Sequence, residues 1–91
     1  MPVQVRIPLT LRRLTHEQEI VEVQAATVAG AMDALHARYN GIRDRIVDKT
    51  GHIRGSVLVF VNEEDIRFLQ NESTPLKDGD EISIVPAYAG G

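Results

Sequence analysis

The chain has no cysteine among its 91 residues, and this absence excludes several kinds of site. Without a thiol there is no disulfide framework, no thiolate nucleophile, no cysteine-liganded zinc and no iron–sulfur cluster. If the protein takes part in sulfur chemistry, a cysteine side chain does not carry the sulfur.

Two further absences narrow the class of protein. No apolar run approaches the roughly 20 residues of a membrane-spanning helix, and the first residues lack the charged-then-apolar pattern of a signal peptide. We therefore expect a cytoplasmic chain with no membrane partner. A basic excess is also missing, because 13 acidic residues outnumber 10 lysines and arginines and the net charge is -3. Proteins that bind nucleic acid usually carry a strong basic excess, so a nucleic-acid partner is not expected.

The residues that are present indicate one small soluble globular domain. Hydrophobic residues make up 43% of the chain, which is too many for a disordered segment of such low net charge. A chain of this length leaves no room for a second domain, because domains usually run to about 100–150 residues.

Alternating polarity predicts strands at residues 3–9, 19–24 and 81–85. A strongly apolar run predicts another strand at 56–61, and a short strand is expected at 66–68. Between the second and third strands, apolar side chains recur at helical spacing and predict one helix from Val28 to Tyr39. Thr27 can cap the start of this helix, and Asn40-Gly41 is a stop signal. A short helical turn is expected near residues 42–47, and turns at 62–65 and 76–80.

The order of these elements predicts an α+β fold with the helix packed across one face of a sheet. The β-grasp (ubiquitin-like) roll has this order: a mixed sheet of about five strands packed on one helix. In that roll the last strand lies in the middle of the sheet, parallel to the first, with the third strand on its other side. We expect residues 1–86 to form the domain and residues 87–91 to form a flexible C-terminal Gly-Gly tail.

Most side chains that could carry chemistry have ordinary explanations. His16, His36 and His52 show no metal-ligand spacing, so no metal site is expected. The acidic clusters 63–65 and 78–80 do not match a calcium loop and are interpreted as solvated turns.

Two other patterns are weak for similar reasons. The glycine-flanked stretch 51–55 lacks the Gly-Lys-Ser/Thr ending of a phosphate-binding loop. Arg38, Arg43 and Arg45 form a modest basic group, which we interpret as a solvated edge. Within this group, Arg38 is placed to meet the C-terminal carbonyls of the helix.

The C-terminus is the remaining feature. After Pro86 the residues are small except Tyr88, and no charged side chain follows Glu81. The tail Ala87-Tyr88-Ala89-Gly90-Gly91 spans at most about 17 Å when extended. A narrow arm ending in two glycines can enter another protein's channel, because the backbone without a Cβ passes close to a ligand. Its reactive group is then the carboxylate of Gly91, which becomes an acyl donor once a partner enzyme adenylates it. A cloning scar or frayed tail is the alternative.

The sequence resembles the small ubiquitin-like sulfur carriers of the ThiS/MoaD family, and among them the CysO type. Three segments carry the resemblance: 61–68 (VNEEDIRF), 76–82 (LKDGDEI) and 84–91 (IVPAYAGG). The opening residues 3–8 and 11–12 also fit. Tyr88 departs from the small aliphatic residue usual before Ala-Gly-Gly. This departure leaves the exact partner open but not the class of protein.

The resemblance implies a carrier and not an enzyme. An ATP-dependent activating enzyme would adenylate the carboxylate of Gly91, and a sulfur donor would displace AMP to leave a thiocarboxylate. The tail residues Ala87, Tyr88, Ala89 and Gly90 would insert into the partner. For the CysO type, the acceptor enzyme is a pyridoxal-phosphate-dependent cysteine synthase that uses O-phosphoserine, and a protease then releases cysteine. For the MoaD type, it is the large subunit of molybdopterin synthase. The chain itself would bind no cofactor.

Strand alternation predicts a docking surface. If the third and last strands are neighbours, Leu58, Phe60 and Val85 form an apolar patch on the sheet face away from the helix. We call these three residues the sheet-face patch. In the alternative phasing, Phe60 belongs to the core.

Other functions remain open at this point. A ubiquitin-like modifier would use the same activated tail but join it to lysines of other proteins. A plain interaction domain would not use the tail at all. An independent enzyme is the weakest interpretation, because no nucleophile–base pair stands out.

Overall fold

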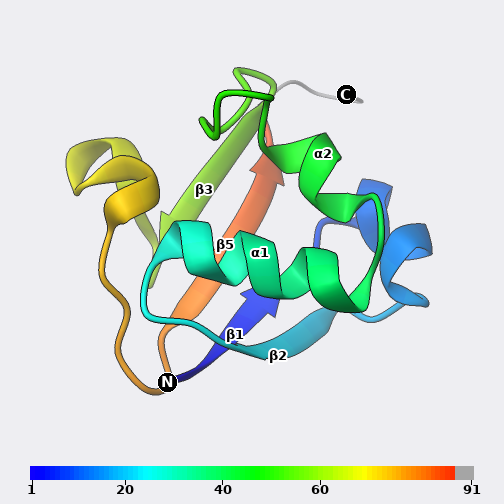
Figure 1. Cartoon of the computed structure of the whole chain (residues 1–91), viewed down its shortest axis with the longest axis horizontal. Helices are drawn as coiled ribbons and strands as arrows, with labels where there is room; N and C mark the ends of the chain where they lie inside the picture. Colours follow the sequence, from blue (N-terminus) through cyan, green and yellow to red (C-terminus); the bar gives the residue numbers. More distant parts are fainter. Residues whose placement is uncertain (88–91) are drawn as a thin grey trace.

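The computed structural model describes residues 1–87, and its centre is one mixed sheet of five strands (Figure 1). The strand order is β2-β1-β5-β3-β4, with β5 parallel to β1 and antiparallel to β3. The predicted β-grasp roll is confirmed. Its strands are β1 (Pro2–Arg6), β2 (Ile20–Gln24), β3 (Val57–Val61), β4 (Glu64–Asp65) and β5 (Glu81–Pro86).

The helix α1 (Val28–Arg38) lies across one face of this sheet, and the short α2 (Ile42–Ile46) follows it (Figure 1). The hydroxyl of Thr27 caps α1 by accepting a hydrogen bond of 3.1 Å from the Gly30 N–H. The helix ends at Arg38, with Tyr39 as its C-cap. Gly41 then begins α2 with a φ of 95°, which glycine tolerates without steric cost. No helix within residues 1–87 has the length and apolar character needed to cross a membrane.

The core lies between the sheet and the two helices. Alternate residues of the strands point into it, and α1 contributes one apolar stripe. The fully buried side chains with the largest volumes include Ile7, Met32, Leu35, Ile42, Ile46 and Ile82. The other sheet face is left without a covering layer among the described residues, so its side chains are available to a partner.

The first strand is shorter than predicted. It ends at Arg6, and a 3₁₀ helix, η1 (Leu9–Thr15), begins at Leu9 between the first and second strands. Pro8 has no N–H to continue a sheet ladder, and it stands immediately before η1. Leu9, predicted as the last inward residue of the strand, is therefore 76% exposed.

The predicted strand at residues 66–68 is wrong. The turn after β3 contains only Asn62 and Glu63, which have φ values of 50° and 72°, so the returning strand already begins at Glu64. Asp65 then accepts a hydrogen bond of 2.9 Å from the Arg67 N–H and starts a 3₁₀ helix, η2 (Ile66–Phe68). A second short 3₁₀ helix, η3 (Asn71–Ser73), follows.

Candidate functional site

The central strand β5 delivers the chain to the point where the predicted tail begins. Pro86 pairs with Val57, and the Ala87 N–H donates a 2.9 Å hydrogen bond to the Ser56 carbonyl. The root of the tail is thus held against β3 (Figure 1). Tyr88, Ala89, Gly90 and Gly91 lie outside the described residues, so their insertion into a partner and the reactivity of the Gly91 carboxylate stay predictions.

A hollow of about 340 Å³ lies beside this root. Its walls come from the end of β5, from η1 and from α2, and include Leu11, Arg45, Val85 and Pro86. Arg45, which was predicted to belong to a basic group with Arg38 and Arg43, lines this hollow.

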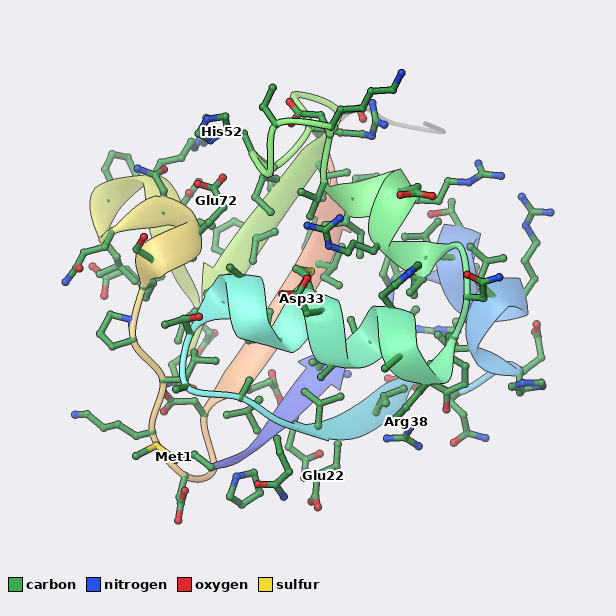
Figure 2. All side chains as sticks on the ribbon, viewed as in Figure 1. Met1, Glu22, Asp33, Arg38, His52 and Glu72 are labelled. Atoms are coloured by element: carbon green, nitrogen blue, oxygen red, sulfur yellow. The ribbon has the colours of Figure 1, made fainter. Side chains whose placement is uncertain are left out.

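Each of the other two arginines has its own partner. Arg43 pairs with Asp33 at 2.9 Å. Arg38 was predicted to meet the C-terminal carbonyls of its own helix. It donates instead to the Glu22 carbonyl of β2 at 2.6 Å. It also lies over the Tyr39 ring, 5.3 Å from the centroid. The long side chain reaches across to the neighbouring strand, which helical spacing alone does not reveal; Figure 2 shows it beside Glu22.

The predicted patch residues share one face of the sheet next to the tail root. Leu58 pairs with Val85, and Phe60 pairs with Ser83 on the neighbouring strand. The intervening residues Val59 and Ile84 are buried beneath the helices, so the alternation places Leu58, Phe60 and Val85 on the opposite face. Leu58 and Phe60 are half-buried, and Val85 is 38% exposed. Their use as a docking surface stays a prediction.

Charged groups that the sequence analysis did not single out adjoin this patch. Arg6 of β1 lies opposite Ser83, and its guanidinium donates to Glu19 at 2.8 Å and to Glu81 at 3.5 Å. The open face is therefore apolar toward β3 and charged toward β1. The signal in the sequence was the outward position of Arg6 in an alternating strand.

The three histidines do not form a site. His16 lies 5.7 Å from the Tyr39 ring, His36 is exposed on α1, and His52 lies 3.5 Å from a Glu72 carboxylate oxygen. Within residues 1–87, no three potential metal-ligating side chains gather in one place.

Two residues that carried the family resemblance form a turn lock, which we define as the contact between Asn62 and Asp80. The Asn62 amide donates to the Asp80 carboxylate at 2.9 Å, and its oxygen accepts from the Glu81 N–H at 2.9 Å. Asp80 also accepts from the Lys77 N–H at 2.8 Å. The lock fixes the start of β5, about 20 Å from the tail root for a strand of six residues. The turn at 78–80 was predicted to be a solvated turn, but the Asp80 carboxylate in it accepts hydrogen bonds from Asn62 and from Lys77.

Replacing Asn62 by alanine is expected to lower the free energy of unfolding by about 1–3 kcal/mol. The change removes both side-chain hydrogen bonds of the lock and places alanine at a φ of 50°. Urea denaturation measures the loss, and Asp78→Ala is the matched control, because the described structure gives the Asp78 side chain no hydrogen bond. A loss of tail activation in N62A at full stability would contradict a purely structural lock.

Comparison with known proteins places the chain in a family. The profile of the ThiS family matches residues 5–91. The sulfur carrier protein CysO of Mycobacterium tuberculosis is 39% identical over 93 residues, covering 100% of both chains. Small archaeal modifier protein 3 of Haloferax volcanii is 35% identical over 66 residues, covering 72% of this chain and 71% of that one.

The fold agrees with solved relatives. A chain in the crystal structure of the Amycolatopsis orientalis BexX/CysO complex superposes with a TM-score of 0.92 and 39% identity. The match covers 98% of this chain and 99% of that one. The M. tuberculosis CysO crystal structure matches with a TM-score of 0.90 and 36% identity, covering 94% and 99%.

Proposed function

This chain belongs to the ThiS family, and we propose that it is a CysO-type sulfur carrier whose reactive group is the terminal carboxylate of Gly91. The observation that carries the proposal is the path of β5. It runs through the middle of the sheet and ends at a held root, Ala87, from which four residues lead to Gly91. These residues can extend about 14 Å beyond the domain, far enough to reach a recessed site in a partner.

The chemistry requires two steps on partner enzymes. An activating enzyme joins the Gly91 carboxylate to the AMP part of ATP, and pyrophosphate leaves. A sulfide equivalent from a donor then attacks the carbonyl carbon, the bond to AMP breaks, and AMP leaves behind a thiocarboxylate. The carrier supplies the acyl group and the docking surface, so it is a co-substrate rather than a catalyst, and the ATP belongs to the partner.

We propose cysteine biosynthesis in the cytoplasm as the destination of the sulfur. The acceptor is then a pyridoxal-phosphate-dependent cysteine synthase. The similarity to CysO along the whole length of both chains supports this destination. The large subunit of molybdopterin synthase is the alternative acceptor for the same thiocarboxylate.

We propose that the activating enzyme and the acceptor enzyme both contact the sheet-face patch. It lies on the uncovered face of the sheet and ends at the tail root, so one partner can contact Phe60 and the tail together. Apolar side chains that remain partly exposed beside a functional tail are typical of protein interfaces.

Replacing Phe60 by alanine is expected to weaken binding to the activating enzyme at least about tenfold, because a large aromatic contact of 1.4 kcal/mol or more is lost. The stability should fall by less than the roughly 3–5 kcal/mol of a core phenylalanine, since Phe60 is only half-buried. Calorimetric titration measures binding, and a denaturation curve measures stability. Ile20→Ala is the control, because Ile20 is an exposed apolar residue on the same face of the sheet but on the edge strand β2, with β1 and β5 between it and Phe60. A full core-sized loss of stability would place Phe60 in the core and remove the patch.

The function is tested by the mass of the protein isolated from its native host. A thiocarboxylate adds about 16 Da, which is close to the mass of one methionine oxidation, so fragmentation must place the change on Gly91. The purified chain is also incubated with the activating enzyme, ATP and sulfide. Sulfur on Gly91 in either sample supports the carrier. A Gly91 carboxylate that stays unmodified with the active enzyme contradicts it.

A second candidate function is protein modification, favoured by the similarity to a small archaeal modifier protein. A lysine amine would then attack the carbonyl carbon of the same acyl adenylate, and an amide bond would form as the bond to AMP breaks and AMP leaves. Tryptic peptides bearing the C-terminal residues of this chain on a lysine of another protein would identify it. A free thiocarboxylate on Gly91 without such peptides would support the sulfur-carrier function and not protein modification.

A further inference from the structure

The tail contains one residue that the sulfur-carrier function does not explain. Tyr88 is the only large side chain among residues 87–91, whose other members are alanines and glycines. A channel that takes in the whole tail has to accept the phenol ring, although the chemistry at Gly91 does not use it. Tyr88 directly follows Ala87, the residue that is held against β3 at the tail root.

The alternation of β5 predicts the side toward which Tyr88 is directed. Ile82 and Ile84 are buried beneath the helices, whereas Val85 is exposed on the open face. The pairing with β3 continues in register to the hydrogen bond of the Ala87 N–H. Because side chains of an extended chain alternate between the two faces, the next even-numbered position belongs to the side of the helices. The continued alternation therefore directs Tyr88 toward the hollow beside the tail root.

This hollow, which we call the tail-root hollow, has a volume of about 340 Å³. Cavities that hold small organic ligands begin at about 300 Å³, so this one has room for a single phenol ring. The helix α2 stands beside the end of β5 and closes one side of it (Figure 1). The apolar part of its lining consists of Pro8, Leu11, Val57, Ile84, Val85 and Pro86.

The polar groups of the tail-root hollow match those of a tyrosine. Thr10 and Ser56 bring hydroxyls, and a buried tyrosine hydroxyl usually has a hydrogen-bond partner. Arg45 is the only charged residue among the described lining residues, and no ion pair within residues 1–87 involves it. A guanidinium is attracted to the face of an aromatic ring, as Arg38 is to Tyr39 in this chain at 5.3 Å. The lining therefore offers apolar contacts to the ring, a cation to its face and hydroxyls to its oxygen.

The covalent connection favours this ring over other occupants. Consecutive Cα atoms are about 3.8 Å apart, so the Tyr88 side chain starts close to Pro86, which itself lines the hollow. Docking the ring orders one residue beyond a root that is already hydrogen-bonded, whereas a separate molecule loses all its translational freedom. The Gly91 carboxylate can reach Arg45 only by ordering all four residues beyond the root.

We propose that in the free chain the ring of Tyr88 docks in the tail-root hollow, in contact with Leu11 and Arg45. The three residues 89–91 then project from the domain, and the tail reaches about 10 Å instead of about 14 Å. All three are small, so they fit a narrow channel without the ring. A partner that takes in the whole tail has to displace Tyr88 first, so the docking restrains the reactive end until that partner binds.

Tyrosine fluorescence tests the docking in the full chain. The sequence has two tyrosines and no tryptophan, so Tyr39→Phe leaves Tyr88 as the single tyrosine emitter. We expect acrylamide to quench Tyr88 at least about threefold less than it quenches the peptide acetyl-Pro-Ala-Tyr-Ala-Gly-Gly, because the docked ring buries much of its surface. Nuclear Overhauser contacts between the Tyr88 ring and the Leu11 methyl groups should locate the ring in the hollow.

Two serine substitutions in the same background separate the role of Arg45 from a general effect of charge. Arg45→Ser is expected to raise the quenching of Tyr88 about twofold, since the cation no longer covers the ring. Arg13→Ser is the matched control, because Arg13 is exposed on η1 and does not line the hollow. Both positions are on the surface, so both variants should unfold at the same denaturant concentration. Equal quenching of the two variants would contradict the contact with Arg45.

Other results would overturn the docking itself. One is quenching equal to that of the free peptide, and another is ring contacts with the sheet-face patch in place of Leu11. A chain that ends in a Gly91 amide should keep the protection of Tyr88; its loss would show that the carboxylate, not the ring, holds the tail. Protection that grows with protein concentration would mean that a second copy of the chain covers the ring. No activating enzyme is present in these experiments, so their outcome is independent of the sulfur-carrier test.

Discussion

Adding one alanine after Gly91 is expected to reduce activation of the carrier by at least about 10²-fold. The reacting carboxylate would move to a residue with a Cβ, roughly 3.5 Å further along the tail, and small displacements of reacting atoms have effects of this size. The measurement is the rate of pyrophosphate release with the activating enzyme and ATP, together with the mass of the product.

The control for this variant is one alanine added before Met1. Met1 precedes β1, which runs parallel to β5, so Met1 lies at the end of the sheet where β5 begins, away from the tail root (Figure 1). Both variants should unfold at the same denaturant concentration, because neither changes a buried residue. Normal pyrophosphate release from the chain with the extended C-terminus would contradict the role of Gly91 as the reacting residue. No release from either chain would indicate an interaction domain that does not use its terminal carboxylate.

Replacing Ile82 by alanine is expected to lower the free energy of unfolding by about 2–5 kcal/mol. Ile82 is fully buried in the central strand and lies between Val5 of β1 and Val61 of β3, so neighbouring elements cannot close the cavity easily. A domain of this size has a total stability of about 5–14 kcal/mol, so the loss is a large part of it. Urea denaturation followed by circular dichroism measures the change.

Ser83→Ala is the matched control for Ile82→Ala, because Ser83 is next in the same strand and points to the opposite face. A change of about 0.5 kcal/mol or less is expected for this surface position. Equal effects of the two substitutions would mean that the strand does not have the described inward and outward faces.

The sequence predicted those elements whose signals are local and repeated. Alternating valines and isoleucines marked β1 and β5, an apolar run marked β3, and Thr27 marked the start of α1. The stop signal Asn40-Gly41 lies just beyond the last residue of α1, Arg38. The prediction failed at residues 66–68, where three residues are too few to distinguish a strand from a 3₁₀ turn. There the Asp65 carboxylate decides the structure by accepting the Arg67 N–H.

Some features of the candidate site could likewise be predicted from the sequence, and others could not. The small residues of the tail and the outward phase of Leu58 and Phe60 are properties of contiguous stretches, so they could be read from the sequence. The contact of Asn62 with Asp80 could not, because 18 residues separate them and only the two turns bring them together. The early end of β4 at Asp65 could not be predicted either, because the residue pattern does not determine the length of so short a strand.

The position of β5 also has a mechanical consequence. A force applied at the tail root would act along β5, which lies between its parallel neighbour β1 and its antiparallel neighbour β3. The pull runs along the strands, so the hydrogen bonds on both sides are loaded together in shear instead of being peeled apart in turn. Asn62 and Asp80 anchor the far end of the same strand. The arrangement of β5 between two neighbours should therefore resist unfolding by a force applied at the tail root.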